Sequence, residues 1–190
     1  MVDRSPLIVG ISGASGAILG ICALRLLQEL SIDAHLVVSR SAALTLHLET
    51  GMSLQDAEAL AAHRHRVGDM AAPIASGSFR TRGMLIAPCS VRTMSEIATG
   101  VTSSLLTRAA DVTLKERRPL VLMVRETPLH LGHLRTMTAL AEMGAILFPP
   151  LPAYYAGLTS LEDAARQSIG RALDLFGLDW PGLRRWDGRP

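Results

Sequence analysis

The residues best suited to chemistry in this chain are the glycines and small side chains of residues 10–16, GISGASG. They follow an apolar run at 6–9 and lead into a helix-compatible run at 17–29, an order that predicts a strand, a tight turn and a helix. The N–H groups that open such a helix carry roughly half a positive charge and favour a phosphate. We expect a phosphate-binding turn here. The alternative is that Gly13 and Gly16 only allow close packing of the helix on the sheet.

Two residues, Ser12 and Ser39, indicate which class of phosphate-bearing ligand is expected. A dinucleotide-binding GxGxxG turn has glycine where Ser12 stands, and an acidic residue where Ser39 follows the next apolar run. A hydroxyl suits a phosphate or ribityl oxygen better than it suits an adenosine ribose, which favours a mononucleotide over NAD. A P-loop is excluded, because no glycine precedes a Lys and Ser/Thr pair.

A second chemistry-bearing set consists of charged side chains and one tyrosine: Arg108, Lys115, Arg125, Glu126, Tyr155 and Arg171. Arg125 and Glu126 directly follow the apolar run at 120–124, which places them at the end of a strand. Arginine binds phosphate oxygens in a bidentate manner, and Lys115, the only lysine of the chain, adds a mobile charge. The set predicts an anionic ligand, although Arg108 can also be a plain charge on a helix surface.

The histidines predict no metal site. His130 and His133 are three residues apart, and His63 and His65 are two residues apart. A zinc site needs a third ligand at suitable spacing, which is missing, as is an HEXXH motif. We expect these histidines at a helix start and on the surface.

The two cysteines, Cys22 and Cys89, form neither a disulfide framework nor a CxxC pair, which suits a reducing compartment. We expect both thiols to be buried. The alternative for Cys89 is a nucleophile paired with a histidine.

Short apolar runs alternate with helical patterns, which predicts an α/β fold with a parallel sheet and helices on both faces. The expected strands are 7–11, 34–38, 83–87, 119–124 and 145–148. The expected helices are 16–29, 40–49, 90–98, 103–116, 130–142 and 160–176, and residues 58–82 predict an irregular flap. Because ligands of such sheets bind at the carboxyl ends of the strands, we expect the site in the segments that follow them.

Composition limits the classes of protein. A chain of 190 residues, 48% of them hydrophobic, suits one domain over residues 1–190. Charges or glycines interrupt every apolar run, so we expect no membrane insertion, and the first residues lack a signal-peptide pattern, which makes the cytoplasm the expected location. A net charge of +2 and an aromatic content of 4% argue against nucleic-acid binding.

Four separated motifs carry a family resemblance: GISGASGA, APCSVRTMSEIATG, RAADVTLKERRPLVLMVRETPLHLGHLRTM and PPLPAYY. Together they resemble the UbiX-like flavin prenyltransferases, and the resemblance runs from residue 7 to residue 186. The chain is also similar to the flavin-dependent cysteine decarboxylases. Those enzymes carry PASANT where this chain has PCSVRT, and a PxMNxxMW motif that this chain lacks.

The resemblance implies a flavodoxin-like or Rossmann-like subunit that binds FMN. Its implied activity is to join a dimethylallyl group from dimethylallyl phosphate to N5 and C6 of reduced FMN. The product, prenylated FMN, is implied to serve a UbiD-like decarboxylase. Family members form homododecamers, so a homo-oligomer with its sites at subunit interfaces is implied. A non-catalytic FMN-binding subunit and a direct flavin-dependent decarboxylase are the alternatives.

The resemblance also implies roles for single residues. Those implied to contact FMN are Gly13, Ala14, Ser15, Ser39, Ser90, Val91, Arg92, Thr93 and Arg125. Those implied around the donor phosphate are Lys115, Glu126, Tyr155 and Arg171, with Tyr155 and Arg171 supplied by a neighbouring subunit and Arg108 as a further candidate. The implied catalytic residues are Glu49, Lys115 and Glu126. Ala156, Gly157 and Leu158 stand where many members have a proline, which predicts a more mobile loop over the donor.

Overall fold

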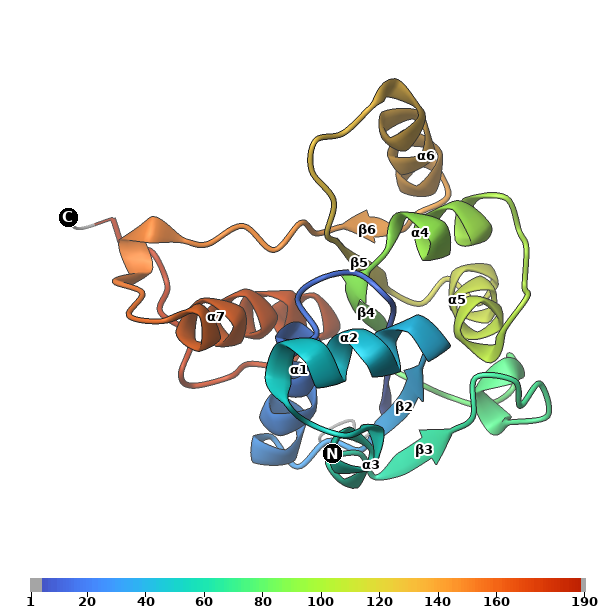
Figure 1. Cartoon of the computed structure of the whole chain (residues 1–190), viewed down its shortest axis with the longest axis horizontal. Helices are drawn as coiled ribbons and strands as arrows, with labels where there is room; N and C mark the ends of the chain where they lie inside the picture. Colours follow the sequence, from blue (N-terminus) through green and yellow to red (C-terminus); the bar gives the residue numbers. More distant parts are fainter. Residues whose placement is uncertain (1–4, 189–190) are drawn as a thin grey trace.

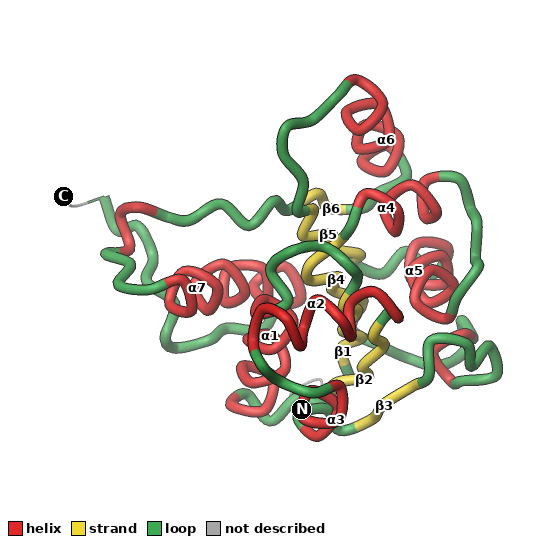
Figure 2. The backbone as a smooth tube through the Cα atoms, in the orientation of Figure 1, coloured by secondary structure: helices red, strands yellow, loops and turns green. Residues whose placement is uncertain are grey.

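The alternating apolar runs form one six-stranded parallel sheet in the computed structural model, which describes residues 5–188 (Figure 2). The strands are β1 (Leu7–Ile11), β2 (Ala34–Val38), β3 (His63–His65), β4 (Gly83–Cys89), β5 (Leu120–Val124) and β6 (Ile146–Leu147). Their order across the sheet is β3-β2-β1-β4-β5-β6, and every pair is parallel. The predicted parallel α/β architecture is confirmed.

Helices cover both faces of this sheet (Figure 1). Helix α1 (Ile18–Glu29) and helix α7 (Leu161–Leu173) pack together on one face, while α4 (Val91–Ala98), α5 (Leu105–Lys115) and α6 (Leu131–Glu142) lie on the other. Helices α2 (Arg40–Thr50) and α3 (Leu54–Ala59) pack on the start of α1. Short 3-10 turns occur at Pro73–Ala75, Tyr154–Ala156 and Asp174–Phe176.

Three central strands have apolar residues on both faces. All residues of β1, β4 and β5 are buried, with the sequences LIVGI, GMLIAPC and LVLMV. Each fully buried Val, Leu or Ile side chain stabilises the fold by about 2 kcal/mol relative to exposure. Polar side chains are therefore restricted to the strand ends, which is where the candidate site lies.

The structure differs from the sequence prediction between residues 50 and 82. Residues 54–59 form helix α3, and residues 63–65 form the edge strand β3, where the sequence predicted only an irregular flap after residue 58. Helix α3 begins with a capping box, in which Ser53 and Asp56 bond to each other's backbone N–H groups. This local pattern is readable in the sequence, whereas the three residues of β3 carry too little signal.

Both cysteines are buried, as predicted. Burial raises the pKa of Cys22 to about 11 and that of Cys89 to about 12, so both are neutral thiols at physiological pH. A neutral, fully buried Cys89 does not suit a nucleophile. Within residues 5–188, no helix has both the length and the apolar character needed to cross a membrane.

Three histidines hold the edge strand β3 to the sheet. His35 of β2 is 6% exposed, its Nδ1 lies 2.9 Å from Nε2 of His65, and its ring lies 4.4 Å from the ring of His63. Phe79 also packs against His35, with the ring centroids 5.1 Å apart. Burial lowers the pKa of His35 to about 4; the charges of His63 and His65 add to this effect, and Asp33 opposes it.

We expect this cluster to make folding sensitive to mild acid. His35 is neutral in the folded protein down to about pH 4, but in the unfolded chain it takes up a proton near its ordinary pKa of 6.5. The unfolded state therefore binds more protons between these values, and stability falls as the pH falls. From about pH 7.5 to about pH 5, the free energy of unfolding should decrease by about 2 kcal/mol more in the parent than in His35→Gln.

Urea unfolding at one fixed protein concentration measures this difference. The exposed histidine variant His47→Gln is the matched control and should keep the pH dependence of the parent. Equal pH dependence in the parent and in His35→Gln would contradict the prediction.

Candidate functional site

The strand order reverses between β1 and β4, and this is where the candidate site lies. From β1 the chain proceeds outward to β2 and β3, whereas β4, β5 and β6 follow on the other side. The helices that follow β1 and β4 therefore lie on opposite faces of the sheet, and the carboxyl edge at this point is the usual place for a ligand in an open α/β sheet. Figure 1 shows the start of α4 and the start of α2 at this edge.

Hydroxyl groups line a cleft of about 470 Å³ at this edge. Three of its residues are N-caps: Ser39 accepts a bond from the N–H of Ala42 (3.1 Å), Ser90 from that of Thr93 (3.3 Å) and Ser104 from that of Thr107 (3.3 Å). The N-termini of α2, α4 and α5 thus meet at one hollow. Their partial positive charges and hydroxyl donors suit a phosphate.

Charged residues at the rim add to this cleft. Arg40 and Arg92 line it, together with Glu96. The Glu96 carboxylate accepts bonds from Arg92 Nε (2.9 Å) and from the Ser103 hydroxyl (2.8 Å), which ties α4 to the segment before α5. Val67 and Gly68 of the segment after β3 also line the cleft. Sequence reasoning missed these two, because no local pattern relates them to α4.

The turn after β1 differs from the sequence expectation in one respect. The N–H groups of Gly16 and Ala17, which we expected to face a phosphate, both donate to Oε2 of Glu49, at 2.8 Å and 2.9 Å. The last turn of α2 brings this carboxylate to the N-terminus of α1, where the helix dipole favours a negative charge. The phosphate-suited hollow therefore lies at Ser39 and Ser90 rather than at the start of α1.

Glu49 is held as a carboxylate. Burial by itself raises its pKa, but bonds from the Ala17 N–H, the Ser15 hydroxyl and the Gly16 N–H, with the charge of Arg125, lower it overall. Gly16 has a φ of +101°, a backbone conformation that suits glycine and aims these N–H groups at the carboxylate. Glu49 is thus ionised and structurally engaged at neutral pH.

Arg125 lies beside the same turn, directly after β5. Its Nε donates to the carbonyl oxygen of Ser15 at 3.0 Å, which fixes the plane of the guanidinium and leaves four of its five N–H donors for a ligand. Glu126 follows at the exposed edge, and its Oε1 accepts a bond from the N–H of Thr127 at 3.0 Å. The structure therefore brings Ser15, Arg125 and Glu126 to one edge of the sheet, as the strand pattern predicted, and the packing of α2 adds Glu49.

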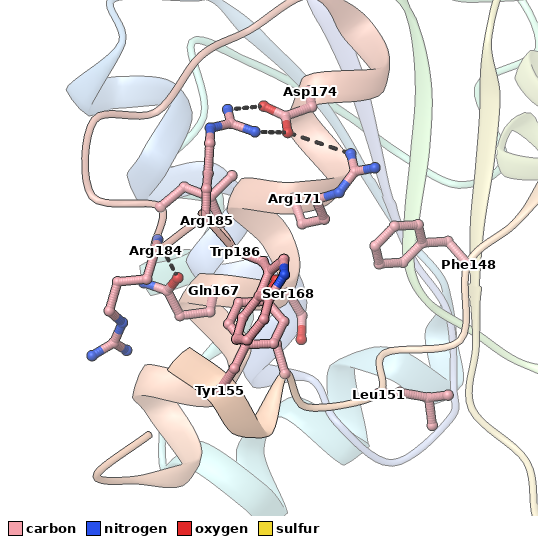
Figure 3. Close-up of a pocket in the computed structure, with 12 residues that line it drawn as sticks. Phe148, Leu151, Tyr155, Gln167, Ser168, Arg171, Asp174, Arg184, Arg185 and Trp186 are labelled. Atoms are coloured by element: carbon pink, nitrogen blue, oxygen red, sulfur yellow. Dashed lines mark hydrogen bonds and ion pairs between the residues drawn. The ribbon is translucent and has the colours of Figure 1, made fainter. Parts of the chain in front are cut away.

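Tyr155 and Arg171 lie in a different place, in a pocket of about 370 Å³ beside α7 (Figure 3). After β6 the chain runs away from the sheet as an extended arm (Figure 1), and the short 3-10 turn Tyr154–Ala156 follows. Tyr155 packs edge-on against Trp186 of the C-terminal segment, with the ring centroids 5.6 Å apart. Arg171 contacts Asp174 at 3.3 Å, and Arg185 binds both oxygens of that carboxylate at 2.7 Å and 2.8 Å.

Gly157 ends the short turn that carries Tyr155. Its φ is +57° and its ψ is +49°, and its N–H closes the turn on the carbonyl of Tyr154. Proline cannot adopt this conformation, because its ring holds φ near −65°. Gly157 therefore permits a turn that proline at this position would not, and the greater mobility of this loop stays a prediction.

Lys115 and Arg108 lie along α5, which runs from the cleft toward the opposite edge of the sheet. Arg108 forms an ion pair with Asp111 at 2.8 Å and donates to the carbonyl of Ala75. Lys115, at the end of the helix, pairs with Glu116 and lies near Pro119, ahead of β5. Arg125 follows β5, so about 15 to 20 Å of strand separates the two cations.

The remaining site candidates concern histidines and metal ligands. His130 caps the N-terminus of α6, as predicted, by accepting bonds from the N–H groups of Gly132 and His133. His63 and His65 lie in the edge strand β3, and His65 is half-buried. Among residues 5–188, no group of three or more His, Cys, Asp or Glu side chains is arranged to hold a metal ion.

Comparison with known proteins identifies close relatives. A family model described as Flavoprotein matches residues 1–170. The chain is 56% identical over 185 residues to the flavin prenyltransferase UbiX of Escherichia coli strain K12, which covers 96% of this chain and 98% of the relative.

Two solved structures agree with this relationship. A UbiX crystal structure in complex with FMN and dimethylallyl pyrophosphate superposes with a TM-score of 0.96 at 47% identity, covering 99% of this chain and 100% of the other. A dodecameric FMN-dependent UbiX-like decarboxylase from Escherichia coli O157:H7 gives a TM-score of 0.93 at 47% identity, covering 96% and 100%.

The position of Glu49 leads to a prediction about stability. Glu49→Ala leaves the N–H groups of Gly16 and Ala17 without their acceptor, which should lower the free energy of unfolding by about 1 to 2 kcal/mol. Glu49→Gln keeps an acceptor oxygen and should lose less. Urea unfolding of the ligand-free protein at about pH 7 measures both, and Glu142→Ala, an exposed carboxylate on α6, is the control. A Glu49→Ala variant as stable as this control would contradict the capping role.

Proposed function

The chain belongs to the UbiX flavin prenyltransferase family, and we propose that it transfers a dimethylallyl group from dimethylallyl phosphate to reduced FMN. The new bonds form at N5 and C6 of the flavin, and the product, prenylated FMN, serves a UbiD-like decarboxylase. The observation that carries the proposal is the hydroxyl-lined cleft at the point of strand reversal, next to the edge that bears Arg125 and Glu126.

The cleft fits the phosphate end of FMN. Its volume of about 470 Å³ is in the range of small-molecule sites, and the N-termini of three helices converge on it. Ser39, Ser90 and Thr93 would bind the flavin phosphate, with Val91 and Arg92 in the same turn. Gly13, Ala14 and Ser15 would lie along the flavin, because the first turn adjoins α2: a Cβ at Gly13 would overlap the Ser41 hydroxyl.

The chemistry requires cations and exclusion of water. The C–O bond of the donor breaks, its electron pair leaves with the phosphate, and an allylic cation remains. Arg125, with four unbonded donors, stabilises the departing phosphate, a role that Lys115, Arg171 and Arg108 can share. Reduced FMN supplies the nucleophilic N5 and the C6 position.

Bond formation at N5 releases the N5 proton. Ring closure then adds a proton to the remaining double bond of the prenyl group and removes one from C6, and a carboxylate or the departed phosphate can carry these protons. Glu49 and Glu126 differ in their suitability for this role. Glu49 already accepts two backbone bonds, and its lowered pKa makes it a weak base. Glu126 is exposed at the strand edge and accepts one bond, from Thr127. We assign the proton transfer to Glu126 and an orienting role to Glu49.

The proposed donor site needs more than one subunit. Lys115 lies at the amino end of β5, the Tyr155–Arg171 pocket lies beside α7, and Arg125 lies at the carboxyl end of β5. A single phosphate cannot contact residues so far apart in one chain. Neighbouring copies in a homododecamer would supply Lys115, Tyr155 and Arg171 to the edge that carries Arg125.

We place the protein in the cytoplasm. This location is supported by its two unpaired, buried thiols, which suit a reducing compartment.

The proposed activity is tested by the mass of the flavin product. After anaerobic incubation with reduced FMN and dimethylallyl phosphate, flavin extracted from the protein should be heavier than FMN by one prenyl unit. Oxidised FMN with the same donor is the control and should remain unchanged, because its N5 is not nucleophilic. Unmodified FMN after incubation with the reduced form would overturn the proposal and favour a flavin-binding subunit.

The sharing of sites between subunits predicts complementation. Lys115→Ala and Arg125→Ala should each lose at least about a hundredfold in transfer rate, since each removes a preorganised charge. Oligomers reassembled from equal amounts of both variants should recover about a quarter of the parent activity, because about a quarter of the sites then combine an intact Arg125 with an intact Lys115 from a neighbour.

The control pairs two residues of the same strand end. Mixing Arg125→Ala with Glu126→Gln should recover nothing, because every site then lacks one of the two. Absence of recovery in the Lys115 mixture, with mixed oligomers verified by native mass spectrometry, would show that Lys115 does not act across an interface.

A further inference from the structure

The buried hydroxyl of Ser12 connects the two loops of the candidate flavin site. We propose that Ser12 is a positioning residue, which holds the turn after β1 and the turn after β4 at the separation that FMN binding requires. This inference rests on the proposed function, because it assumes that these two loops bind the flavin.

Ser12 lies directly after β1 and is 1% exposed. Its hydroxyl donates to the carbonyl oxygen of Pro88 at 2.9 Å and accepts a bond from the N–H of Ser90 at 2.7 Å. Its own N–H also donates to the Pro88 carbonyl, at 3.2 Å. One small side chain thus bonds to an acceptor within β4 and to a donor directly after it, across the point of strand reversal.

The bonds of Ser12 extend to both halves of the site. On one side, the carbonyl of Ser12 accepts a bond from the N–H of Ala14 at 2.9 Å, which shapes the turn at residues 13–16. On the other side, Ser90 caps α4, and its hydroxyl donates to Oγ1 of Thr93 at 3.1 Å. The orientation of the Ser90 backbone, and hence of the hydroxyls in the cleft, depends on the N–H that Ser12 binds.

Removal of the Ser12 hydroxyl should therefore act on the phosphate end of the ligand. In Ser12→Ala, the N–H of Ser90 loses its acceptor in a place that water cannot easily reach. The turn at residues 90–93 must shift to solvate this N–H, and the hydroxyls that face the cleft shift with it. A ligand that uses the phosphate site should lose more affinity than one without a phosphate.

The experiment compares FMN with riboflavin, which lacks the phosphate. Flavin fluorescence titrations on the assembled full-length protein should give an FMN dissociation constant about tenfold larger for Ser12→Ala than for the parent. The riboflavin constant should change by less than about threefold. Ser12→Cys is close in size but a weaker hydrogen-bonding partner. It should lie between Ser12→Ala and the parent, and it serves as the test variant if Ser12→Ala does not fold.

The matched control is Thr113→Val. Thr113 is 1% exposed, and its hydroxyl donates to the carbonyl of Ala109 within α5, with no contact to either loop. This variant also loses one buried hydroxyl. It should be less stable to heat but should bind FMN as the parent does.

Each outcome has a separate meaning. If the parent does not bind FMN, the proposed function itself fails. If the parent binds FMN and the Ser12 variants bind it equally well, the positioning role is overturned. If the variants lose FMN and riboflavin affinity by the same factor, or if Thr113→Val loses FMN affinity as strongly, the effect is one of general stability and the inference is also overturned.

Discussion

Parallel pairing of β1 with both β2 and β4 is the constraint on which the rest of this structure depends. Leu7 is in register with Ala34 on one side and with Gly83 on the other, so three strands run in the same direction to one edge, where β1 and β2 end in register and β4 continues to Cys89. Because β1 and β4 are buried on both faces, neither can carry a polar group within its length. The hydroxyl and charged side chains must therefore follow the strand ends. There the serines cap the N-termini of the helices that come next.

This constraint explains how much of the site can be read from the sequence. Apolar runs predict strands, parallel strands end at one edge, and the residues after each run are then neighbours in space. On this basis the sequence predicts that Ser39, Ser90 and Arg125 lie at the same edge, but not which groups their side chains contact. The capping roles of Ser39 and Ser90 are also local, since each stands three residues before the residue whose N–H its hydroxyl accepts, Ala42 and Thr93 respectively.

Other features depend on contacts between distant segments, and no local pattern contains them. Glu49 reaches the start of α1 because α2 packs across α1, which sets residues more than thirty positions apart side by side. The edge strand β3 has the polar sequence HRH, and its pairing depends on His35 of another strand. A motif can therefore indicate that a residue such as Lys115 suits an anionic ligand. It does not show that Lys115 lies at the amino end of the strands, away from Arg125.

The positions of the charged side chains separate two groups of hydrogen-bond donors: those at the N-termini of α2, α4 and α5, and those of Arg125. The negative charge of Glu49 occupies the N-terminus of α1, so a second anion there would be repelled, and the phosphate-suited donors are those of α2, α4 and α5. Arg125 is fixed by the Ser15 carbonyl of the same turn, close enough to Glu49 to lower its pKa. The other donors of Arg125 remain available to a ligand at the edge that also carries Glu126. In the proposed function, neighbouring copies enclose the donor phosphate at this edge, and assembly would then be part of the chemistry.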